Sequence, residues 1–336
     1  MTWRDGVHLT GTPIWCDARR RRDVCFVSSA DRIGAAGHGQ LIGTSTALAL
    51  VAARGDGPLS APLRRPFTLG TLRLELIPSG RTYGSAALHV DNGGRTVLYA
   101  GAVRTDAAAF GAPATGTGAR GSGLEPAEVR SCDAAVVAAP FGEPHHRFAP
   151  RDVVAERVVA WVRARLATGT SPVLVVDTAS DGLELAACLA REGLAVAGSR
   201  AVRDAALRLA SASADLEVPT IRAPGREPGV VIRLESDRAR RAPHAGASAS
   251  PDATARSATA LISGRALDPH PTWDAGFAWP FAAGREQLLA WIEQTRAKDV
   301  FVTGACAEAI VRAVGARARL LGPPRQMALF PREAVS

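Results

Sequence analysis

The chain has 336 residues, of which 47% are hydrophobic and 21% are charged. These are ordinary values for a globular protein and exclude a disordered chain. The length allows one large α/β domain with an insert, or two modules. The formal net charge is +8 and Lys298 is the only lysine, so arginine carries the positive charge. A basic surface of this kind suits a polyanionic partner such as nucleic acid, although a GC-rich genome produces the same arginine bias.

Cellular location follows from two absences in the sequence. No apolar run approaches the ~20 residues that a membrane-spanning helix requires, and the N-terminus lacks the apolar core of a signal peptide. We therefore expect a cytoplasmic protein without a membrane partner. The five cysteines show no CxxC or Cys/His spacing, which favours reduced core thiols over disulfides or a zinc cluster; they are Cys16, Cys25, Cys132, Cys188 and Cys306.

The first part of the chain, residues 1–147, predicts a hairpin-rich sheet. Asp91-Asn-Gly-Gly94 lies between two apolar runs and is a strong signal for a hairpin turn. Residues 111–123 are rich in Gly, Ala, Thr and Ser and predict a loop. Short apolar runs predict strands at residues 23–28, 72–77, 86–90, 96–100 and 132–137.

The pattern changes to helical periodicity at Asp152, a reasonable N-cap. The apolar positions 154, 158, 161, 162 and 166 share one helical face. A strand at 173–176, a helix at 183–189 and a strand at 194–196 follow. Alternation of this kind predicts an inserted parallel βαβ module at residues 148–222.

We expect residues 223–321 to rejoin the sheet structure formed by residues 1–147. A helix at 286–295, a strand at 300–303 and a helix at 307–314 form the last unit. Residues 238–259 are rich in Ala, Ser and Arg and predict a disordered surface loop. Residues 322–336 are expected to form a flexible tail.

Eight segments in this order resemble one known group, the metallo-β-lactamase-fold nucleases with a β-CASP insert. That group includes exonucleases of RNA 3′-end processing and exonucleases associated with DNA ligases. The resemblance covers essentially the whole chain and implies an α/β fold, a four-layer αββα sandwich with an inserted β-CASP-like module. The segments are Ile14–Asp17, Phe26–Gly34, Ile77–Ala86, Val97–Arg104, Cys132–Gly142, Ser263–Pro269, Phe277–Leu289 and Val300–Gly304.

Enzymes of that group hold two zinc ions through His and Asp side chains, which activate water and clamp the scissile phosphate. Their first signature is H-x-H-x-D-H, and the matching segment, residues 28–34, contains no histidine. With the Ile-Gly end of this segment in register, Asp31 matches the family Asp and Arg32 its last His. Asp17 clearly matches a family position, one that orients metal ligands.

The other signatures also lack their metal ligands. In Pro78-Ser-Gly-Arg81-Thr-Tyr-Gly-Ser-Ala86 the metal-binding His is replaced by Arg81, and the bridging Asp that follows Tyr-x-Gly is replaced by Ala102. The family Glu before T-F-G corresponds to Ala138, S-D-H-A-D to residues 280–284, and the His of T-H-G to Gly304. The resemblance therefore implies that this chain binds no metal cofactor and is a pseudoenzyme.

Three arginines stand at these vestigial positions, and two roles remain open for them. A guanidinium stays protonated and cannot replace imidazole as a metal ligand. Arg32, Arg81 and Arg104 can pair with Asp17 and Asp31, or they can bind a phosphate group through two parallel hydrogen bonds.

The adjacent His145 and His146 raise the question of a separate metal site. Adjacent side chains rarely converge on one ion without further ligands, and the only acid near them in the sequence is Glu143. We therefore interpret them as loop residues.

The tail contains Gln326-Met-Ala-Leu-Phe330, which resembles the Q-L-[SD]-L-F peptide by which bacterial replication and repair proteins dock on the sliding clamp. Gln326 supplies an amide and Met327, Leu329 and Phe330 supply apolar groups for a groove. The alternative is that the Leu-Phe pair folds back onto the core.

The resulting functional hypothesis is a catalytically inactive accessory or adaptor protein of DNA repair or RNA processing, which binds nucleic acid backbone and the sliding clamp. One alternative is an active metal-dependent nuclease with displaced ligands. Another is a structural subunit that pairs with an active paralogue.

Overall fold

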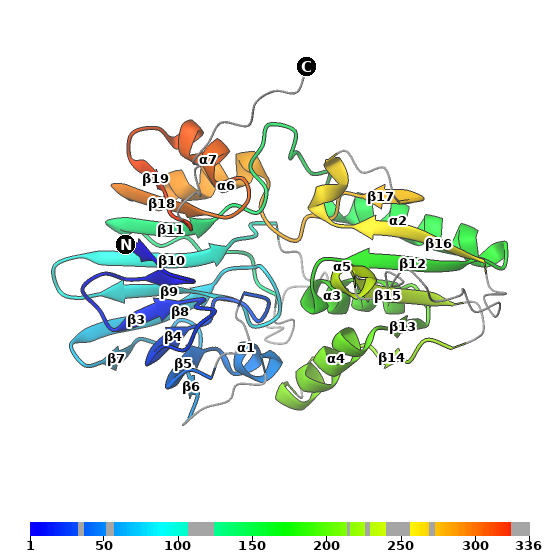
Figure 1. The fold of residues 1–336 in the computed structure, drawn as a ribbon, viewed down its shortest axis with the longest axis horizontal. Helices are drawn as coiled ribbons and strands as arrows, with labels where there is room; N and C mark the ends of the chain where they lie inside the picture. The colour runs from blue at the N-terminus through cyan, green and yellow to red at the C-terminus, as the bar shows by residue number, and fades with distance from the viewer. Residues whose placement is uncertain are drawn as a thin grey trace, which may run out of the picture.

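The structure is a computed structural model, and it describes residues 1–32, 37–51, 57–106, 124–213, 216–225, 229–239, 256–268 and 273–323. In this part of the chain the strands form three sheets, and helices flank them, so the protein is of the mixed α/β class (Figure 1). The expected Gly-rich loop at 111–123 and nearly all of the expected tail lie outside the described residues. None of the described helices is long and apolar enough to cross a membrane.

The first sheet contains six strands that neighbour one another in chain order. Its first strands pair antiparallel and the pairs from β3 onward are parallel. The short helix α1 (Ser45–Leu50) follows the fifth strand and is capped by the Thr44 side chain, which accepts from the Ala47 N–H. The strands are β1 (Thr2–Trp3), β2 (Val7–His8), β3 (Ile14–Cys16), β4 (Val24–Phe26), β5 (Gln40–Gly43) and β6 (Leu59–Ser60).

The second sheet has the order β19-β18-β11-β10-β9-β8-β7. The predicted hairpin is present, because β9 and β10 pair antiparallel from Asp91 opposite Thr96. Two helices, α6 (Arg285–Gln294) and α7 (Ala307–Val314), flank β18 in the chain. The strands are β7 (Phe67–Leu69), β8 (Leu72–Pro78), β9 (Ala86–Asp91), β10 (Thr96–Ala102), β11 (Ala134–Ala138), β18 (Asp299–Thr303) and β19 (Ala318–Leu320).

These two sheets pack face to face. Phe26 and Ile42 of the first sheet share one buried cluster with Leu74 and Leu88 of the second. The opposite face of the second sheet packs against α6 and α7, and its apolar residues share a cluster with Trp291, which is 1% exposed. Alternation along each strand therefore divides the side chains between two cores.

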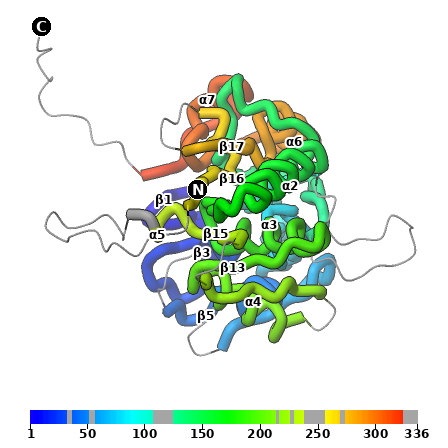
Figure 2. The backbone as a smooth tube through the Cα atoms, turned by 90° about the vertical axis from the view of Figure 1, so that its right-hand side faces the viewer, coloured from blue at the N-terminus to red at the C-terminus, as the bar shows by residue number. Residues whose placement is uncertain are grey.

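The third sheet is wholly parallel, with the order β14-β13-β15-β12-β16-β17. Helix α2 (Arg151–Ala167) packs against β12 and β17, while α3 (Ala179–Arg191) and α4 (Arg200–Ala212) pack against β13 and β15. Figure 2 looks onto this unit and shows α2 and α3 on one side of its strands. The strands are β12 (Ser171–Val176), β13 (Val196–Gly198), β14 (Ile221–Arg222), β15 (Val230–Leu234), β16 (Ser257–Ile262) and β17 (Ala275–Phe277).

The structure corrects the predicted end of the insert. Residues 148–222 were expected to form the whole module, but β15, β16 and β17 belong to the same sheet as β12. The separate unit therefore continues to Phe277, and the chain returns to the second sheet only with α6. The sequence signal failed because short apolar runs show that a strand exists without showing which sheet it joins.

The expected disordered loop at 238–259 is also too long at both ends. The short helix α5 (Glu235–Ala239) covers its first two residues, and β16 begins at Ser257 and pairs with β12. Residues 240–255 lie outside the described part of the chain.

The sheet pair and the third-sheet unit contact each other directly. Helix α1 packs against α4, and Arg208 Nη1 donates to the Leu50 carbonyl oxygen at 3.3 Å. Tyr83 of the first unit shares a buried cluster with Trp279 and Phe281, which lie between β17 and α6. The junction between the units is therefore packed with apolar side chains, and it also contains the residues that the sequence marked as a former active site.

Candidate functional site

Asp17 lies directly after β3, in the left-handed region at φ 49°. Its Oδ1 accepts from the Ser28 backbone N–H at 2.8 Å, and its Oδ2 accepts from Ser28 Oγ at 2.6 Å and from the Tyr99 hydroxyl at 2.8 Å. Burial raises the pKa of the Asp17 carboxyl, although Arg32 and these donors oppose the shift. The carboxylate is thus fully occupied by donors from β10 and from the segment that follows β4.

Gly101 explains how β10 approaches Asp17 so closely. It has φ +60°, and a Cβ at this position would lie 2.4 Å from Ser28 Oγ. Only glycine fits both the conformation and the space. The Tyr-x-Gly sequence therefore serves the local packing in this chain even though the carboxylate that follows it in the resembling family is absent.

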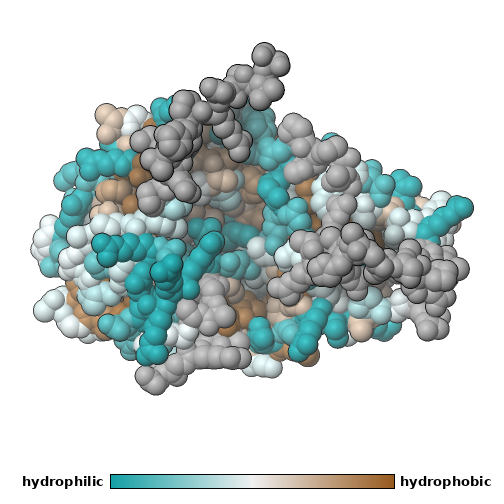
Figure 3. Space-filling model, in the orientation of Figure 1, coloured by the Kyte–Doolittle hydropathy of each residue, from teal (hydrophilic) through white to brown (hydrophobic). Residues whose placement is uncertain are grey.

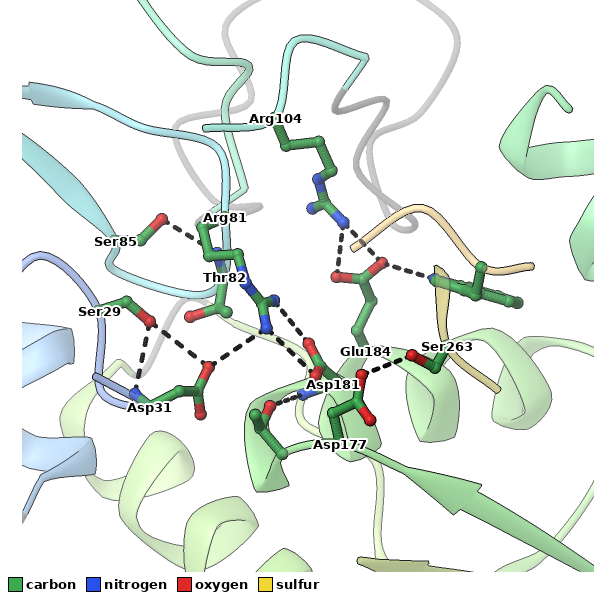
Figure 4. A network of polar contacts seen from close by, with 12 residues as sticks. Ser29, Asp31, Arg81, Thr82, Ser85, Arg104, Asp177, Asp181, Glu184 and Ser263 are labelled. Atoms are coloured by element: carbon green, nitrogen blue, oxygen red, sulfur yellow. Dashed lines mark hydrogen bonds and ion pairs between the residues drawn. The ribbon is translucent and has the colours of Figure 1, made fainter. Parts of the chain in front are cut away.

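Arg81 joins the two units through an ion pair. Its guanidinium donates to both carboxylate oxygens of Asp181, at 2.6 and 3.2 Å, and lies 3.8 Å from Asp31 (Figure 4). Asp181 stands in the first turn of α3, where its own N–H donates to the capping side chain of Thr178. Burial opposes the charge on Arg81, but the two carboxylates outweigh it and raise the pKa of Arg81.

Arg104 makes the second contact and is 0% exposed. Its Nη1 donates to both oxygens of Glu184 on α3, each at 2.9 Å. Glu184 also pairs with Arg151 of α2 and accepts from the Trp279 indole N–H at 3.3 Å. Burial alone would raise the pKa of Glu184, but Arg104 and Arg151 lower it overall, so the carboxylate stays ionised between two guanidinium groups.

Arg32 takes a more peripheral place. Its Nε lies 3.9 Å from Asp17 Oδ2, and its side chain is 34% exposed. The structure thus brings the five predicted positions to one junction, where Arg32 faces Asp17 and Arg81 faces Asp31. Arg104 does not face either of these carboxylates and pairs with Glu184 instead.

Sequence reasoning missed the partners on the third-sheet unit. Asp181 and Glu184 are three residues apart, so they lie on one face of α3, and both are buried although the helix is rich in leucine and alanine. Two acids at that spacing on an apolar helix were the available signal, because buried carboxylates need partners.

A further group of polar side chains lies at the carboxyl edge of the third sheet. Asp177 follows β12, and it accepts from Ser263 Oγ, which follows β16, at 2.5 Å. Arg265 pairs with Asp177 and, at 2.5 Å, with Glu235, which follows β15. Side chains that follow parallel strands meet at this edge, where open α/β sheets commonly bind ligands. Here the edge faces the Arg81 and Arg104 contacts (Figure 4).

The family that the sequence resembles holds two zinc ions at the matching positions. The residues that this chain has there are not suited to bind zinc. The Asp17 oxygens are occupied by three donors, and Asp31 and Asp181 share a guanidinium. A cation beside Arg81 and Arg104 would meet two fixed positive charges, and zinc requires imidazole, thiolate or free carboxylate ligands.

His145 and His146 do have an acid near them, which is a correction to the sequence interpretation. Asp268, distant in sequence, lies 2.7 Å from His145 Nε2 and 3.4 Å from His146 Nε2. These three side chains form a group with the residue types and spacing of a metal site. The sequence could not show this because Asp268 lies 123 residues from His145, in the segment between β16 and β17.

The hydrogen bonds of His146 nevertheless oppose metal binding at this group. Its Nδ1 accepts from the backbone N–H groups of Gly142 and Glu143, at 3.2 and 3.1 Å. The neutral ring must therefore carry its proton on Nε2, the atom that points toward Asp268, and a metal would need a lone pair there. Burial lowers the pKa of His146, which keeps the ring neutral. The hydrogen bond between His145 and Asp268 joins the two units, and His146 Nε2 lies 3.4 Å from the same carboxylate.

Comparison with known proteins gives a likeness of fold alone. No family model matches the chain, and no curated protein matches it. Among solved structures, a protein of unknown function from Enterococcus faecalis V583 is similar, with a TM-score of 0.54 and 10% sequence identity. The alignment covers 90% of this chain and 80% of that chain. At this identity the likeness concerns the fold alone.

Proposed function

We propose that this chain is a non-catalytic relative of the metallo-β-lactamase-fold nucleases with a β-CASP insert, and that it serves as an adaptor in DNA repair or RNA processing. The observation that carries the proposal is the pair of buried contacts Arg81–Asp181 and Arg104–Glu184. They occupy the junction where the resembling enzymes would hold metal and scissile phosphate.

The layer order supports the fold part of the proposal. Helix α1, the first sheet, the second sheet and the α6–α7 pair follow one another as in a four-layer αββα sandwich, and the third sheet is the insert. The residues that match the family's active-site positions lie at the junction between sandwich and insert, so the resemblance implies that the former substrate cleft is there. In this chain the Arg81–Asp181 and Arg104–Glu184 ion pairs join the two units there, where an enzyme would admit substrate.

Arg81 and Arg104 are not available as phosphate ligands in this arrangement. Arg104 is 0% exposed, and the Arg81 side chain is 12% exposed with both of its terminal nitrogens engaged by Asp181. Of the two roles that the sequence left open, the contacts support pairing with carboxylates. The adaptor role therefore requires a nucleic-acid surface built from other residues.

The test is the metal content and nuclease activity of the purified full chain. We expect far less than one zinc or manganese ion per chain by elemental analysis, and no cleavage of single-stranded DNA or RNA with either metal added. Near-stoichiometric metal, with cleavage that Asp17→Ala abolishes and the exposed control Asp23→Ala leaves intact, would show an active nuclease with displaced ligands. The proposal would then be wrong.

The clamp-binding segment remains part of this proposal, and residues 324–336 lie outside the described part of the chain. We propose that Gln326, Met327, Leu329 and Phe330 dock on the bacterial sliding clamp with about micromolar affinity, as is usual for a short peptide that orders on binding. Leu329→Ala/Phe330→Ala should abolish retention on immobilised clamp, and Arg332→Ala/Glu333→Ala should not. Equal retention of both variants would exclude this docking mode.

A further inference from the structure

A second group of arginines differs from the junction arginines because most of its side chains are exposed. The chain runs through Arg19, Arg20, Arg21 and Arg22 between β3 and β4, and Arg4 lies beside them in the turn between β1 and β2. We call these five residues the arginine corner. Arg4, Arg19, Arg20 and Arg21 are exposed and Arg22 is partly buried. Hydrophilic side chains gather over the N-terminal strands in Figure 3.

Backbone contacts hold the two segments of the arginine corner together. The Arg19 N–H donates to the Asp5 carbonyl oxygen at 2.7 Å, and Arg22 Nη2 donates to the Arg4 carbonyl oxygen at 2.6 Å. Gly6 allows this approach, since a Cβ on Gly6 would lie 2.5 Å from the Ala18 Cα. The fold therefore holds the backbone of the two segments side by side.

Two of the five guanidinium groups have side-chain partners of their own. Arg20 pairs with Asp5 at 2.8 Å, and Arg22 lies over the Trp15 ring at 3.7 Å, with His8 stacked on the same ring. Arg4, Arg19 and Arg21 have no side-chain partner within the described segments. Five arginines outnumber the two acidic side chains beside them, Asp5 and Asp23, so the corner has a net positive charge.

We propose that the arginine corner is the nucleic-acid surface of this protein and binds the sugar–phosphate backbone. Guanidinium groups match phosphate oxygens through paired hydrogen bonds, and they gain affinity by releasing counterions from the polymer. The partner class rests on the proposed function, but the location does not, because Arg81 and Arg104 are engaged at the junction whereas Arg4, Arg19 and Arg21 are exposed. Binding by such contacts is independent of sequence and weak, about 10⁻⁶ to 10⁻⁴ M at physiological salt.

The experiment measures fluorescence anisotropy of a labelled single-stranded DNA, in EDTA, with the full chain. Arg19→Glu/Arg21→Glu removes two unpaired guanidinium groups and is compared with Arg157→Glu/Arg312→Glu, which changes the net charge equally at exposed positions on α2 and α7. We expect the corner variant to bind DNA at least about tenfold more weakly at low salt. The slope of the logarithm of the binding constant against the logarithm of the salt concentration should become less steep by about two, because two phosphate contacts are lost. The control should bind within about threefold of wild type.

Equal losses in the two variants would show that only net charge matters, and unchanged binding in the corner variant would place the site elsewhere. Either result overturns the proposal. So does binding to phosphatidylserine vesicles that the corner variant loses while DNA and RNA binding is absent in wild type, which would indicate an anionic membrane surface. EDTA excludes metal-dependent cleavage from the readout, so failure here is distinct from failure of the non-catalytic assignment.

Discussion

The junction between the units and the arginine corner both concentrate arginine, yet they differ in what surrounds the guanidinium groups. At the junction Arg81 and Arg104 are buried and face carboxylates of α3. At the corner Arg19 and Arg21 are exposed and have no partner in the described structure. A buried guanidinium must be paired, whereas an exposed one can remain free for a polyanion. Burial, more than residue type, therefore decides which arginines hold the fold and which can bind a partner.

We expect the largest loss of stability, and so the clearest test of this comparison, from substitution of Glu184. Glu184→Gln leaves Arg104 and Arg151 buried without their shared carboxylate, and breaking a buried pair in this way costs about 3–5 kcal/mol. Urea unfolding at neutral pH measures the loss. Glu192→Gln, on the exposed end of the same helix where Glu192 pairs with Arg163, should cost less than about 1 kcal/mol. Equal unfolding midpoints for the two variants would contradict a structural role for the junction.

A smaller, pH-dependent effect is expected at Asp181. Burial raises the pKa of Asp181 to about 6, the nearby Asp31 carboxylate adds to the rise, and Arg81 opposes it. The folded protein therefore holds this proton more tightly than the unfolded chain. Protonated Asp181 therefore contributes to stability in full below pH ~4, and this contribution is lost as the pH rises to about 6. The free energy of unfolding should fall over this range by no more than about 1.4 kcal/mol per pH unit.

Asp181→Asn should remove that decline from the stability curve. Its cost at neutral pH should be below that of Glu184→Gln, because burial already disfavours the charge on Asp181. Urea unfolding of both proteins from pH 4 to pH 7 checks this expectation. A variant whose curve keeps the same slope as wild type between pH ~4 and ~6 would show that Asp181 does not titrate there.

The smallest effect on stability is expected at the arginine corner. Arg19→Ala/Arg21→Ala removes exposed side chains that touch no described partner, so the free energy of unfolding should change by less than about 0.5 kcal/mol. Thermal unfolding compared with wild type measures it. A loss similar to that of Glu184→Gln would mean that the corner is part of the structural framework, and the contrast between the two regions would disappear.

Local patterns in the sequence predicted individual elements well where one signal dominated. The turn Asp91-Asn-Gly-Gly94 predicted the β9–β10 hairpin, and the period that begins at Asp152 predicted α2. The predicted N-cap was wrong, because Pro150 is the N-cap and Asp152 lies in the first turn. The end of the insert was predicted wrongly because β15 and β16 are recruited to the third sheet by long-range pairing, which no local pattern reports. Sheet membership depends on contacts between distant residues.

The site shows the same division. The sequence singled out Arg81 and Arg104 through the resemblance, but their partners Asp181 and Glu184 lie some 100 and 80 residues away on another unit. Asp268 was missed beside His145 and His146 for the same reason. A motif can mark one member of a polar pair, whereas the other member is known only when the chain is folded.

The central claim is that the junction is a structural ion-pair contact and not a metal centre. The most direct measurement is the melting temperature of the full chain during a titration with zinc, since a ligand that binds the native state raises the melting temperature with its concentration. We predict no saturable rise in wild type and none in the Asp17→Asn variant. A saturable rise in wild type that Asp17→Asn abolishes, and that the control His145→Ala retains, would contradict the claim by placing a zinc ion at the junction.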